Sequence, residues 1–509
     1  MRRIAIVGGG IAGLTAAYEL ATLARQGAPV EAVLFESSNR FGGLIETVRE
    51  GGFTVECGPD AWVTAKPWAR SLALELGLEA ELIPSNDAAR KTWIFLSTPE
   101  NPTGRLVAMP GGMNMMVPSS REALAALDRS PLFTAAAIAA YRAEPARAAE
   151  LLAAIPAADE SIASFTLRHF GPEVLDRVAA PLLSGVFGGD VRTLSVRAVM
   201  PAFVQMEREH GSLIAALAAA AGRHTPAIFT TLRTGLGTLV DRLVAAIPPT
   251  WLRLNTAVTA LEPPPGSQLI DHGPHLAEKM ASHARWTVSI STTAKRLASE
   301  SFDAVLLATP LPATRRLLAP IGPADLLPGE SSSAVLVAFC FPDAVRVPLP
   351  PGFGFLVPPA THADAAPLDS ELPVPLLLAC TFADQKFPHR VPPNGRLIRA
   401  FFGGAAADRL TRCNNDEIAA IARLELARIL NSGAPISGPT PTPLPAAVLT
   451  VVRRWPASLP QYAVGHLDRV AELETRLRRL PGLTLLGNAL HGVGLPDIIR
   501  AARAAVTNP

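Results

Sequence analysis

Residues 4–20, IAIVGGGIAGLTAAYEL, determine what kind of fold this chain can adopt. The unbroken apolar run 4–7 is typical of a parallel strand that is buried on both faces, and the residues after the glycines repeat apolar positions at helical spacing. Between them, Gly8, Gly10 and Gly13 have the G-x-G-x-x-G spacing, which provides a tight turn, room for a pyrophosphate and close packing of helix on strand. The stretch therefore predicts a strand, a glycine turn and a helix whose N-terminus binds phosphate.

A second strand, residues 30–35, ends on Glu36, about 20 residues after the glycines. A carboxylate at this position accepts the two ribose hydroxyls of an adenosine and disfavours a 2′-phosphate. A glycine-rich turn in an ordinary α/β protein would not require an acid there. We therefore predict a dinucleotide site with Glu36 at the ribose.

Residues 36–47, ESSNRFGGLIET, resemble the E-x(3)-R-x-G-G-x(3)-T pattern of FAD-containing amine oxidases, phytoene desaturases and protoporphyrinogen oxidases. Arg40 is able to neutralise phosphate, and Gly42 with Gly43 lets the main chain lie against a flat ring system. Nicotinamide enzymes do not usually carry this second glycine pair. The resemblance implies that the cofactor is FAD.

The composition is that of a globular protein with more than one domain. A chain of 509 residues is too long for one simple core. With 46 basic and 44 acidic residues the net charge is +2, which gives no indication of a nucleic-acid partner. The four cysteines, Cys57, Cys340, Cys380 and Cys413, form no C-x-x-C pair, so we predict neither a metal site nor a disulfide framework.

The sequence carries no recognisable signal for export or membrane insertion. The first strand follows almost directly on Arg2 and Arg3, and no run of 18 uncharged apolar residues exists. We expect a cytoplasmic protein, for which peripheral contact with the inner face of the membrane is left open. The sequence also leaves open whether the protein is a monomer or a homodimer.

Two further stretches narrow the family. Residues 181–195, PLLSGVFGGDVRTLS, and the later EREHGS resemble P-L-L-x-G-I-Y-A-G-D-x-x-x-L-S and E-x-E-x-G-S of protoporphyrinogen oxidases. Residues 487–499, GNALHGVGLPDII, are similar to the C-terminal FAD element of the same enzymes. Because such stretches occur in the same order through nearly the whole chain, the protein resembles oxygen-dependent, FAD-containing protoporphyrinogen or coproporphyrinogen oxidases.

The resemblance implies an α/β fold with a Rossmann-type FAD-binding domain, a mixed-sheet substrate domain and a helical subdomain. The continuous apolar strands expected between residues 334 and 402 suit a sheet with helices on one face and substrate on the other. Residues 263–285 are rich in Pro, Gly and His and are interpreted as an inserted surface loop. We assign 1–76, 223–310 and 451–509 to the FAD-binding domain, and 77–111 and 311–450 to the substrate domain. Residues 112–222 form the helical subdomain, for which contact with a membrane is left open.

The resemblance also implies which residues bind FAD. They belong to the glycine turn, the end of the second strand, the second glycine pair, the Gly58-Pro59 turn, a later strand and the C-terminal element. Glycines followed by a helix N-terminus suit the flavin edge where negative charge gathers on reduction. The predicted set is Gly8, Gly10, Ile11, Ala12, Gly13, Glu36, Ser37, Arg40, Gly42, Gly43, Gly58, Pro59, Asp60, Val258, Asn488, Gly494, Leu495 and Ile498.

Four residues are candidates for substrate contact. Arg90 and Lys91 lie in a segment that resembles one in which a basic residue of protoporphyrinogen oxidases meets a propionate, although a solvated surface cation would look the same. Asp60 is a substrate contact or a turn residue that satisfies its own backbone. Gly185 belongs to a glycine-interrupted helix that suits a cavity wall. No residue is assigned as a catalyst.

The activity implied by the resemblance is the removal of six electrons from a porphyrinogen in heme biosynthesis, in three two-electron rounds with dioxygen as acceptor. Protoporphyrinogen and coproporphyrinogen both remain candidates. An amine oxidase or a carotenoid desaturase is the alternative within the superfamily, although only three tyrosines are present to build an aromatic cage. An alternative of another class is a non-catalytic FAD-binding chaperone or regulator.

Overall fold

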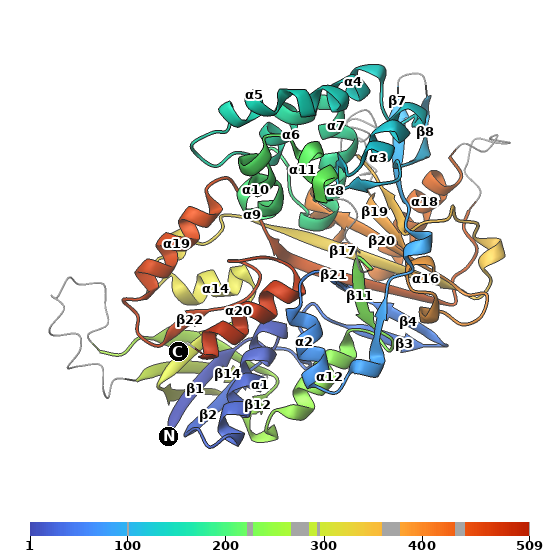
Figure 1. Ribbon diagram of the computed structural model, residues 1–509. Coiled ribbons are helices and arrows are strands. Elements are labelled where there is room, and N and C mark those ends of the chain that lie inside the picture. Colours follow the sequence, from blue (N-terminus) through green and yellow to red (C-terminus); the bar gives the residue numbers. More distant parts are fainter. Residues whose placement is uncertain are drawn as a thin grey trace.

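The structure is a computed structural model that describes residues 1–98, 101–220, 227–265, 285–292, 296–358, 377–432 and 443–507. Within these ranges the chain forms a parallel sheet, a larger mixed sheet and a block of helices, as Figure 1 shows. The predicted loop at 263–285 lies almost wholly outside the described residues. The α/β architecture that the sequence predicted is confirmed.

The N-terminal strand forms the centre of a five-stranded parallel sheet. Ile4 and Ile6 point into one core and Ala5 and Val7 into another, and all four are almost fully buried. This two-sided burial is why the run is apolar at every position. In spatial order the strands are β12 (Leu252–Arg253), β2 (Val30–Phe35), β1 (Arg2–Val7), β16 (Ala304–Leu307) and β22 (Leu483–Leu485).

Different elements cover the two faces of the parallel sheet. One face packs against helices, and the other packs against a small antiparallel sheet and two further helices. The first set is α1 (Ile11–Arg25), α2 (Trp68–Glu75), α12 (Gly237–Ala246) and α20 (Leu495–Thr507). The second set is β13 (Thr256–Glu262), β14 (Trp286–Thr292), β15 (Leu297–Phe302), α14 (Leu311–Leu318) and α19 (His466–Leu477).

The strand order places a switch point between β1 and β16. The chain builds outward from β1 to β2 on one side and later to β16 and β22 on the other. Gly8 follows β1 and Ala308 follows β16, and the Ala308 N–H donates to the Val7 carbonyl over 2.8 Å. Ligands of open α/β sheets bind at the carboxyl ends of the strands at such a point.

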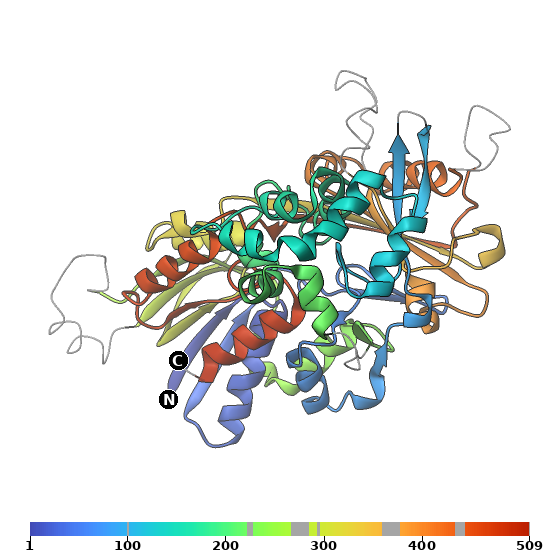
Figure 2. The same cartoon turned by 45° about the horizontal axis from the view of Figure 1, so that its top comes forward.

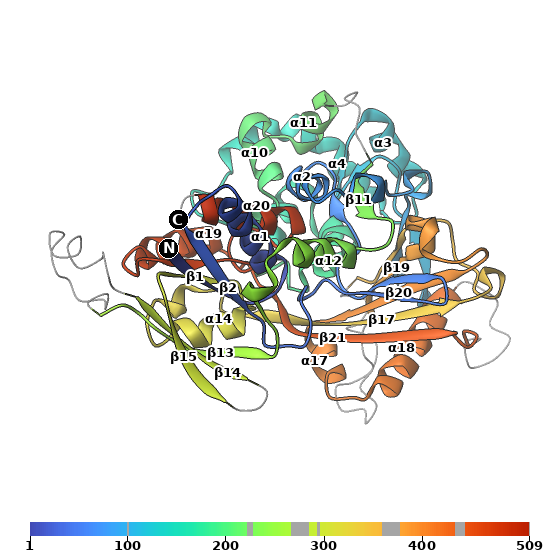
Figure 3. The ribbon, with the colours of Figure 1, turned by 90° about the horizontal axis from the view of Figure 1, so that it is seen from below.

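A seven-stranded mixed sheet forms the second part of the molecule. Helices α17 (Gly404–Leu410) and α18 (Asn415–Leu430) cover one face, as Figure 3 shows. The opposite face packs in part against the hairpin β3 (Thr47–Glu50) and β4 (Phe53–Glu56), which belongs to the segment predicted to bind FAD. In spatial order its strands are β21 (Leu449–Pro460), β17 (Ser331–Phe341), β20 (Arg396–Gly403), β19 (Leu377–Phe382), β18 (Gly354–Leu356), β7 (Thr92–Thr98) and β8 (Asn101–Ala108).

Strand β21 corrects one predicted domain boundary. We assigned residue 451 onward to the FAD-binding domain, but β21 pairs with β17 along most of its length and is an edge strand of the seven-stranded sheet. The apolar run at its start predicts a strand but carries no information about its partner. At another boundary, β6 (Leu82–Pro84) pairs with β11 (Phe229–Leu232), so the segment after α2 begins beside the FAD-binding region.

Helices fill residues 121–220 and form a block at one end of the molecule, which comes forward in Figure 2. Their shared core includes Tyr141, whose hydroxyl donates to the Met116 carbonyl over 2.8 Å. No helix in the described residues is long and apolar enough to cross a membrane. The helices are α3 (Arg121–Ala126), α4 (Ala135–Ala143), α5 (Ala148–Ala153), α6 (Ile162–Phe170), α7 (Pro172–Val174), α8 (Ala180–Phe187), α9 (Val196–Val199), α10 (Pro201–His210) and α11 (Leu213–Ala220).

A buried group of charges joins the helices of this block. His169 Nδ1 lies 3.0 Å from a Glu144 oxygen and Nε2 lies 2.9 Å from a Glu207 oxygen, and the three side chains are at most 2% exposed. Arg168 pairs with Glu207 and with Glu160. Burial opposes the protonation of His169, but the two carboxylates outweigh it and raise its pKa. The charged form of His169 therefore stabilises the folded block.

We expect this stabilisation to be present below the unfolded-state pKa of about 6.5 and to be lost as the pH rises through the higher folded-state pKa. Replacing His169 with Gln should lower the free energy of unfolding by about 2 kcal/mol at about pH 6, where the charge-assisted bonds are intact, and by less at about pH 9. Urea unfolding of both proteins at the two pH values measures the difference. An equal loss at both would contradict a charged His169.

Candidate functional site

The glycine turn after β1 contains two glycines that the fold requires and a third that leaves room for a ligand. A Cβ on Gly8, where φ is +109°, would lie 2.5 Å from the Ala308 oxygen, and one on Gly13 would lie 1.9 Å from the Gly8 oxygen. A Cβ on Gly10 would meet only the Gly43 Cα, at 4.0 Å. Gly10 is also the N-cap of α1 and supplies no side-chain acceptor to its N–H groups. The turn therefore presents an uncapped helix N-terminus beside open space.

The residues predicted at the adenosine lie together at the end of β2. Glu36 Oε2 accepts from the Gly9 N–H over 2.8 Å, and Oε1 accepts from the Ser38 N–H over 2.7 Å. Each oxygen keeps acceptor capacity for a ribose hydroxyl. The Thr256 N–H donates to the Glu36 carbonyl over 2.9 Å, so β13, which carries the buried Val258, begins beside this carboxylate. Ser37, the next residue after Glu36, is exposed.

The second glycine pair rests directly on the first turn. The Gly42 N–H donates to the Gly9 carbonyl over 2.8 Å, and both Gly42 and Gly43 have positive φ angles. The Arg40 guanidinium donates to the carbonyls of Gly43, Ile45 and Phe41 at 2.6, 3.1 and 3.3 Å. Arg40 therefore holds this turn in shape, a role that the sequence pattern did not indicate. Its contact with phosphate stays a prediction.

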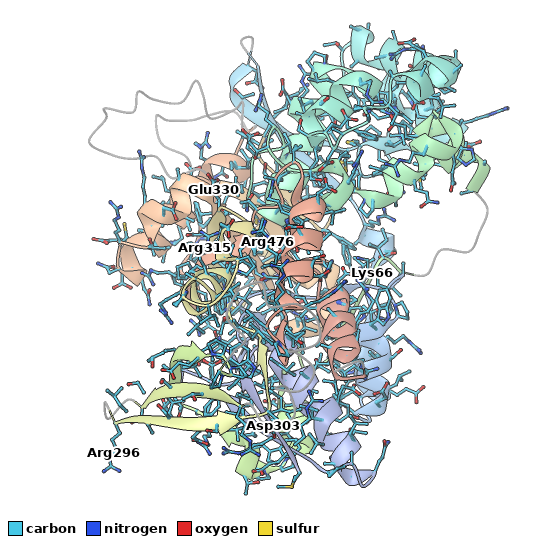
Figure 4. All side chains as sticks on the ribbon, turned by 90° about the vertical axis from the view of Figure 1, so that its left-hand side faces the viewer. Lys66, Arg296, Asp303, Arg315, Glu330 and Arg476 are labelled. Atoms are coloured by element: carbon cyan, nitrogen blue, oxygen red, sulfur yellow. The ribbon has the colours of Figure 1, made fainter. Side chains whose placement is uncertain are left out.

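The C-terminal element reaches the same edge of the parallel sheet. Asn488 follows β22 and donates from Nδ2 to the Ser458 carbonyl over 2.9 Å. Gly494 precedes α20, which begins at Leu495, carries Ile498 in its first turn and packs on α1. Lys66, labelled in Figure 4, lies 2.5 Å from Asp497 in the first turn of α20. The helix N-terminus that the sequence predicted is thus in place.

The Gly58-Pro59 turn fits tightly beside the second glycine pair. A Cβ on Gly58 would lie 2.0 Å from the Leu44 oxygen, so only glycine allows this approach. The Trp455 indole N–H donates to the Cys57 carbonyl over 2.7 Å, which joins the turn to β21 of the seven-stranded sheet. The turn therefore lies where the two sheets meet.

Five charged side chains, which we call the interface cluster, surround this turn. Lys386 Nζ lies 3.0 and 3.1 Å from the two Asp60 oxygens, and Arg399 Nη1 lies 3.1 Å from Oδ2. Arg390 Nη2 lies 3.1 Å from Glu56 Oε1. All five side chains are at most 14% exposed. Asp60 is therefore fixed by cations rather than by its own backbone.

The cations of the cluster determine the charge of Asp60. Burial by itself would raise the pKa of Asp60, but Lys386, Arg399 and Arg390 outweigh it and hold that pKa well below its usual range. Burial lowers the pKa of Lys386, and Asp60 opposes this change. Burial raises the pKa of Glu56, against the attraction of Arg390. Asp60 is therefore an ionised anchor at neutral pH.

The sequence analysis did not select Lys386 and Arg399 as site residues. Lys386 ends α16 (Ala383–Lys386), and Arg399 lies inside the apolar run LIRAFF of β20. A cation in a run that is otherwise buried requires a partner, and that was the available signal for Arg399. Lys386, in an ordinary polar segment, offers no such signal.

The remaining substrate-contact candidates lie apart from the glycine turns. Arg90 and Lys91 are exposed just before β7, and Lys91 Nζ lies 5.0 Å from the centre of the Trp93 ring. Gly185 lies on α8, where a Cβ would be 3.4 Å from Leu356 Cδ2 and so leaves the helix close to β18. In the described part of the chain, no hydrogen bond or ion pair joins these residues to the interface cluster. Their contact with substrate stays a prediction.

Two cavities of about 410 and 420 Å³ lie at the outer edge strand β8. They share Arg105 and Pro131, and neither is lined by a residue of the glycine turns or of the interface cluster. They are therefore separate from the candidate site.

The residues at the sheet edge fit a flavin dinucleotide. The open space at Gly10 and the uncapped N-terminus of α1 suit a pyrophosphate, and Glu36 suits the adenosine ribose. Beyond Gly10, Gly43 lies against Gly10, and Gly58 lies against the carbonyl of Leu44, the residue after Gly43. The predicted cofactor residues near these glycines are thus brought together.

Comparison with known proteins agrees with this geometry. Residues 11–508 match the family described as flavin containing amine oxidoreductase. The chain is 30% identical to the coproporphyrinogen III oxidase of Bacillus subtilis (strain 168), over 100% of this chain and 97% of that one. It is 28% identical to the protoporphyrinogen oxidase of Homo sapiens, over 100% of this chain and 98% of that one.

Solved structures extend the comparison to the fold. A protein from Exiguobacterium sp. 255-15, provisionally named protoporphyrinogen oxidase, superimposes with a TM-score of 0.77 at 28% identity, over 99% of this chain and 98% of that one. Putrescine oxidase superimposes with a TM-score of 0.62 at 15% identity, over 100% and 98% of the two chains, which shows a shared fold alone.

Replacing Gly10 with Val should expel the flavin, because the side chain fills the space beside the N-terminus of α1. We expect the flavin content of the purified protein to fall to about a tenth or less of the wild-type value. Absorbance per mole of protein measures it. Gly329→Val is the matched control, since Gly329 lies in an exposed loop and a Cβ there meets no atom within 4 Å. Full flavin occupancy in Gly10→Val would defeat the pyrophosphate assignment.

Replacing Glu36 with Ala should weaken flavin binding about 10- to 100-fold, because hydrogen bonds to a charged group contribute about 1.5–3 kcal/mol. Titration of the apoprotein with FAD measures the affinity, and circular dichroism checks that the Gly9 turn still folds. Glu31→Ala, on the same strand, should bind FAD as the wild type does. Equal affinities of the two variants would remove Glu36 from the ribose site.

Proposed function

The chain belongs to the family of flavin-containing amine oxidoreductases, and from this premise we propose that it oxidises coproporphyrinogen III to coproporphyrin III in heme biosynthesis with FAD as cofactor. The observation that carries the proposal is the 30% identity to a coproporphyrinogen III oxidase along the whole of this chain. Protoporphyrinogen IX is the second candidate substrate, supported by the 28% identity to the human protoporphyrinogen oxidase.

The chain's own residues account for binding and orientation. When bound, FAD accepts two electrons and a proton from the macrocycle in each of three rounds, and three molecules of dioxygen take up the six electrons and six protons as hydrogen peroxide. The N-terminus of α1 holds the pyrophosphate and Glu36 holds the ribose. The face of the seven-stranded sheet opposite α17 and α18 provides the wall along which a flat substrate would lie.

The described residues give no reason to assign a side chain as general acid or base. Asp60, the carboxylate at the Gly58-Pro59 turn, has both oxygens bound by Lys386 and one also by Arg399. A carboxylate that is held ionised in this way is a weak proton acceptor. Orientation of the substrate against the flavin is then the main contribution of the protein.

The proposal includes dioxygen as the electron acceptor and the cytoplasm as the location. An amine oxidase or a carotenoid desaturase remains the alternative within the family, and a non-catalytic flavin-binding regulator is the alternative outside it. The likeness to putrescine oxidase, at 15% identity, supports the fold and not its substrate.

Aerobic turnover of the flavin-loaded protein with freshly reduced coproporphyrinogen III and protoporphyrinogen IX tests the proposal. We expect porphyrin fluorescence to rise together with peroxide, with kcat/KM at least about tenfold higher for coproporphyrinogen III, since one well-placed charged contact to an extra propionate contributes this much. Gly10→Val serves as the flavin-free control and measures the uncatalysed rate. Bound flavin without fluorescence above that rate, with either substrate, would overturn the proposal and favour amines, carotenoids or a regulatory role.

A further inference from the structure

The interface cluster contains more positive than negative charge. Its cations Lys386, Arg390 and Arg399 all come from the region of the seven-stranded sheet, and its carboxylates Glu56 and Asp60 both come from the FAD-binding segment. Three cations therefore face two carboxylates in a space that is shielded from solvent. Such charges act more strongly on their neighbours than the same charges would in water.

Neighbouring groups do not cancel this surplus. Arg453 forms a balanced pair with Glu46, at 2.5 Å, on the adjacent part of the interface. Arg40 lies 3.5 Å from the same Glu46 and adds positive charge to that side. Burial raises the pKa of the Cys57 thiol to about 11, so this thiol carries no charge at neutral pH. The excess positive charge thus remains at the Gly58-Pro59 turn.

Arg399 lies inside the apolar strand β20 and contacts the Gly58-Pro59 turn directly. One terminal nitrogen lies 3.1 Å from Asp60 and the other donates to the Gly58 carbonyl, but Nε has no partner among the described residues. Thr381, its cross-strand neighbour, also has a buried hydroxyl without a partner in that part of the chain. Cross-strand neighbours share a sheet face, so both groups lie on the face that meets the FAD-binding segment. Thr381 and Arg399 thus leave donor groups free on this face, although unpartnered Nε atoms also occur at Arg390 and Arg396 in the described part of the chain.

The contacts of the glycine turns direct the far end of a dinucleotide toward this place. Glu36 and Gly10 lie at the ribose and pyrophosphate ends of the cradle, and Gly43 lies against Gly10. Gly58 then lies against the carbonyl of the residue after Gly43. With its adenosine at Glu36, an FAD that follows these glycines would extend its ring system toward the Gly58-Pro59 turn, which the interface cluster surrounds.

We propose that Arg399, together with Lys386, stabilises the negative charge that the flavin gains on reduction and so sets the reduction potential of the cofactor. The proposal rests on FAD being the cofactor of the proposed function. Hydride transfer brings two electrons and one proton to the ring system, and the second hydrogen of the substrate leaves as a proton. One negative charge therefore stays on the flavin until a further proton binds, and a nearby cation favours that state. Arg399 and Lys386 act as positioning residues rather than as catalytic ones.

The test measures the potential of the bound flavin by equilibration with reference dyes, without any porphyrinogen. In Arg399→Gln and in Lys386→Met we expect the ratio of reduced to oxidised flavin at a given solution potential to fall about tenfold, which corresponds to about 30 mV for a two-electron couple. Arg396→Gln is the matched control, because Arg396 lies on the same strand and forms a buried pair with Asp384 at 3.0 Å. Its potential should equal that of the wild type.

Arg399→Lys distinguishes the effect of the positive charge from that of the guanidinium hydrogen bonds. It keeps the positive charge and loses the fork of hydrogen bonds, so we expect a potential close to the wild-type value. A potential as low as that of Arg399→Gln would overturn the proposal in favour of a purely structural role. An unchanged potential in both Arg399→Gln and Lys386→Met would also overturn it. If Arg399→Gln does not retain flavin, Lys386→Met and Arg399→Lys decide the question.

The proposed activity and this inference fail in different ways. Because the dye measurement needs only bound flavin, an absence of porphyrinogen oxidation would leave the expected shifts unchanged. Conversely, normal turnover with unshifted potentials would reject the role of Arg399 and keep the proposed reaction. Thermal unfolding of each apoprotein reports separately whether a variant has lost its fold.

Discussion

The ion pairs between Asp60 and the cations of the seven-stranded sheet are the contact on which the arrangement of the molecule depends. They join the end of β4 to β20 and α16, two parts of the chain separated by more than half of its length. Removing one partner of a buried pair costs about 3–5 kcal/mol, because the other charge is left without compensation. The two sheets are therefore held in one relative position, and the Gly58-Pro59 turn between them is held with them.

The glycines of the site have different roles. Gly8, Gly13 and Gly58 are required because a side chain at each would collide with backbone. Gly10 is not required by the polypeptide, since its Cβ position faces open space. A glycine that the fold does not need, between others that it does, is the structural mark of a ligand that approaches the backbone. The G-x-G-x-x-G motif thus contains both glycines that the fold requires and a glycine that leaves room for a ligand.

Local patterns in the sequence predicted the parts of the site that are local in the chain. The strand, the glycine turn, α1 and Glu36 lie within one short segment, and each is specified by burial, by a positive φ angle or by hydrogen bonds to near neighbours. Arg40 shows the limit of such patterns. It lies in a motif associated with phosphate, yet its guanidinium binds the carbonyls of the turn that follows it.

Features that depend on distant segments could not be read in this way. The apolar start of β21 predicts a strand equally well for either sheet. Only its pairing with β17 shows to which sheet it belongs. The interface cluster is still harder to predict from the sequence, because Asp60 and Lys386 are far apart in the chain. The local sequence around each residue also suits a residue that has no role in a site. Arg399 is the exception, since a cation within LIRAFF cannot be buried without a partner.

The two buried charge groups of the molecule differ in how pH acts on them. In the helical block, His169 lies between carboxylates and loses its proton as the pH rises through a raised pKa, so the stability of that block changes with pH. In the interface cluster, Asp60 is ionised far below neutrality, because the cations around it outweigh the effect of its burial. Burial lowers the pKa of both Lys386 and Arg399 there, and Asp60 opposes the change in each. The charge of Asp60 is thus fixed around neutral pH, whereas that of His169 changes as the pH rises.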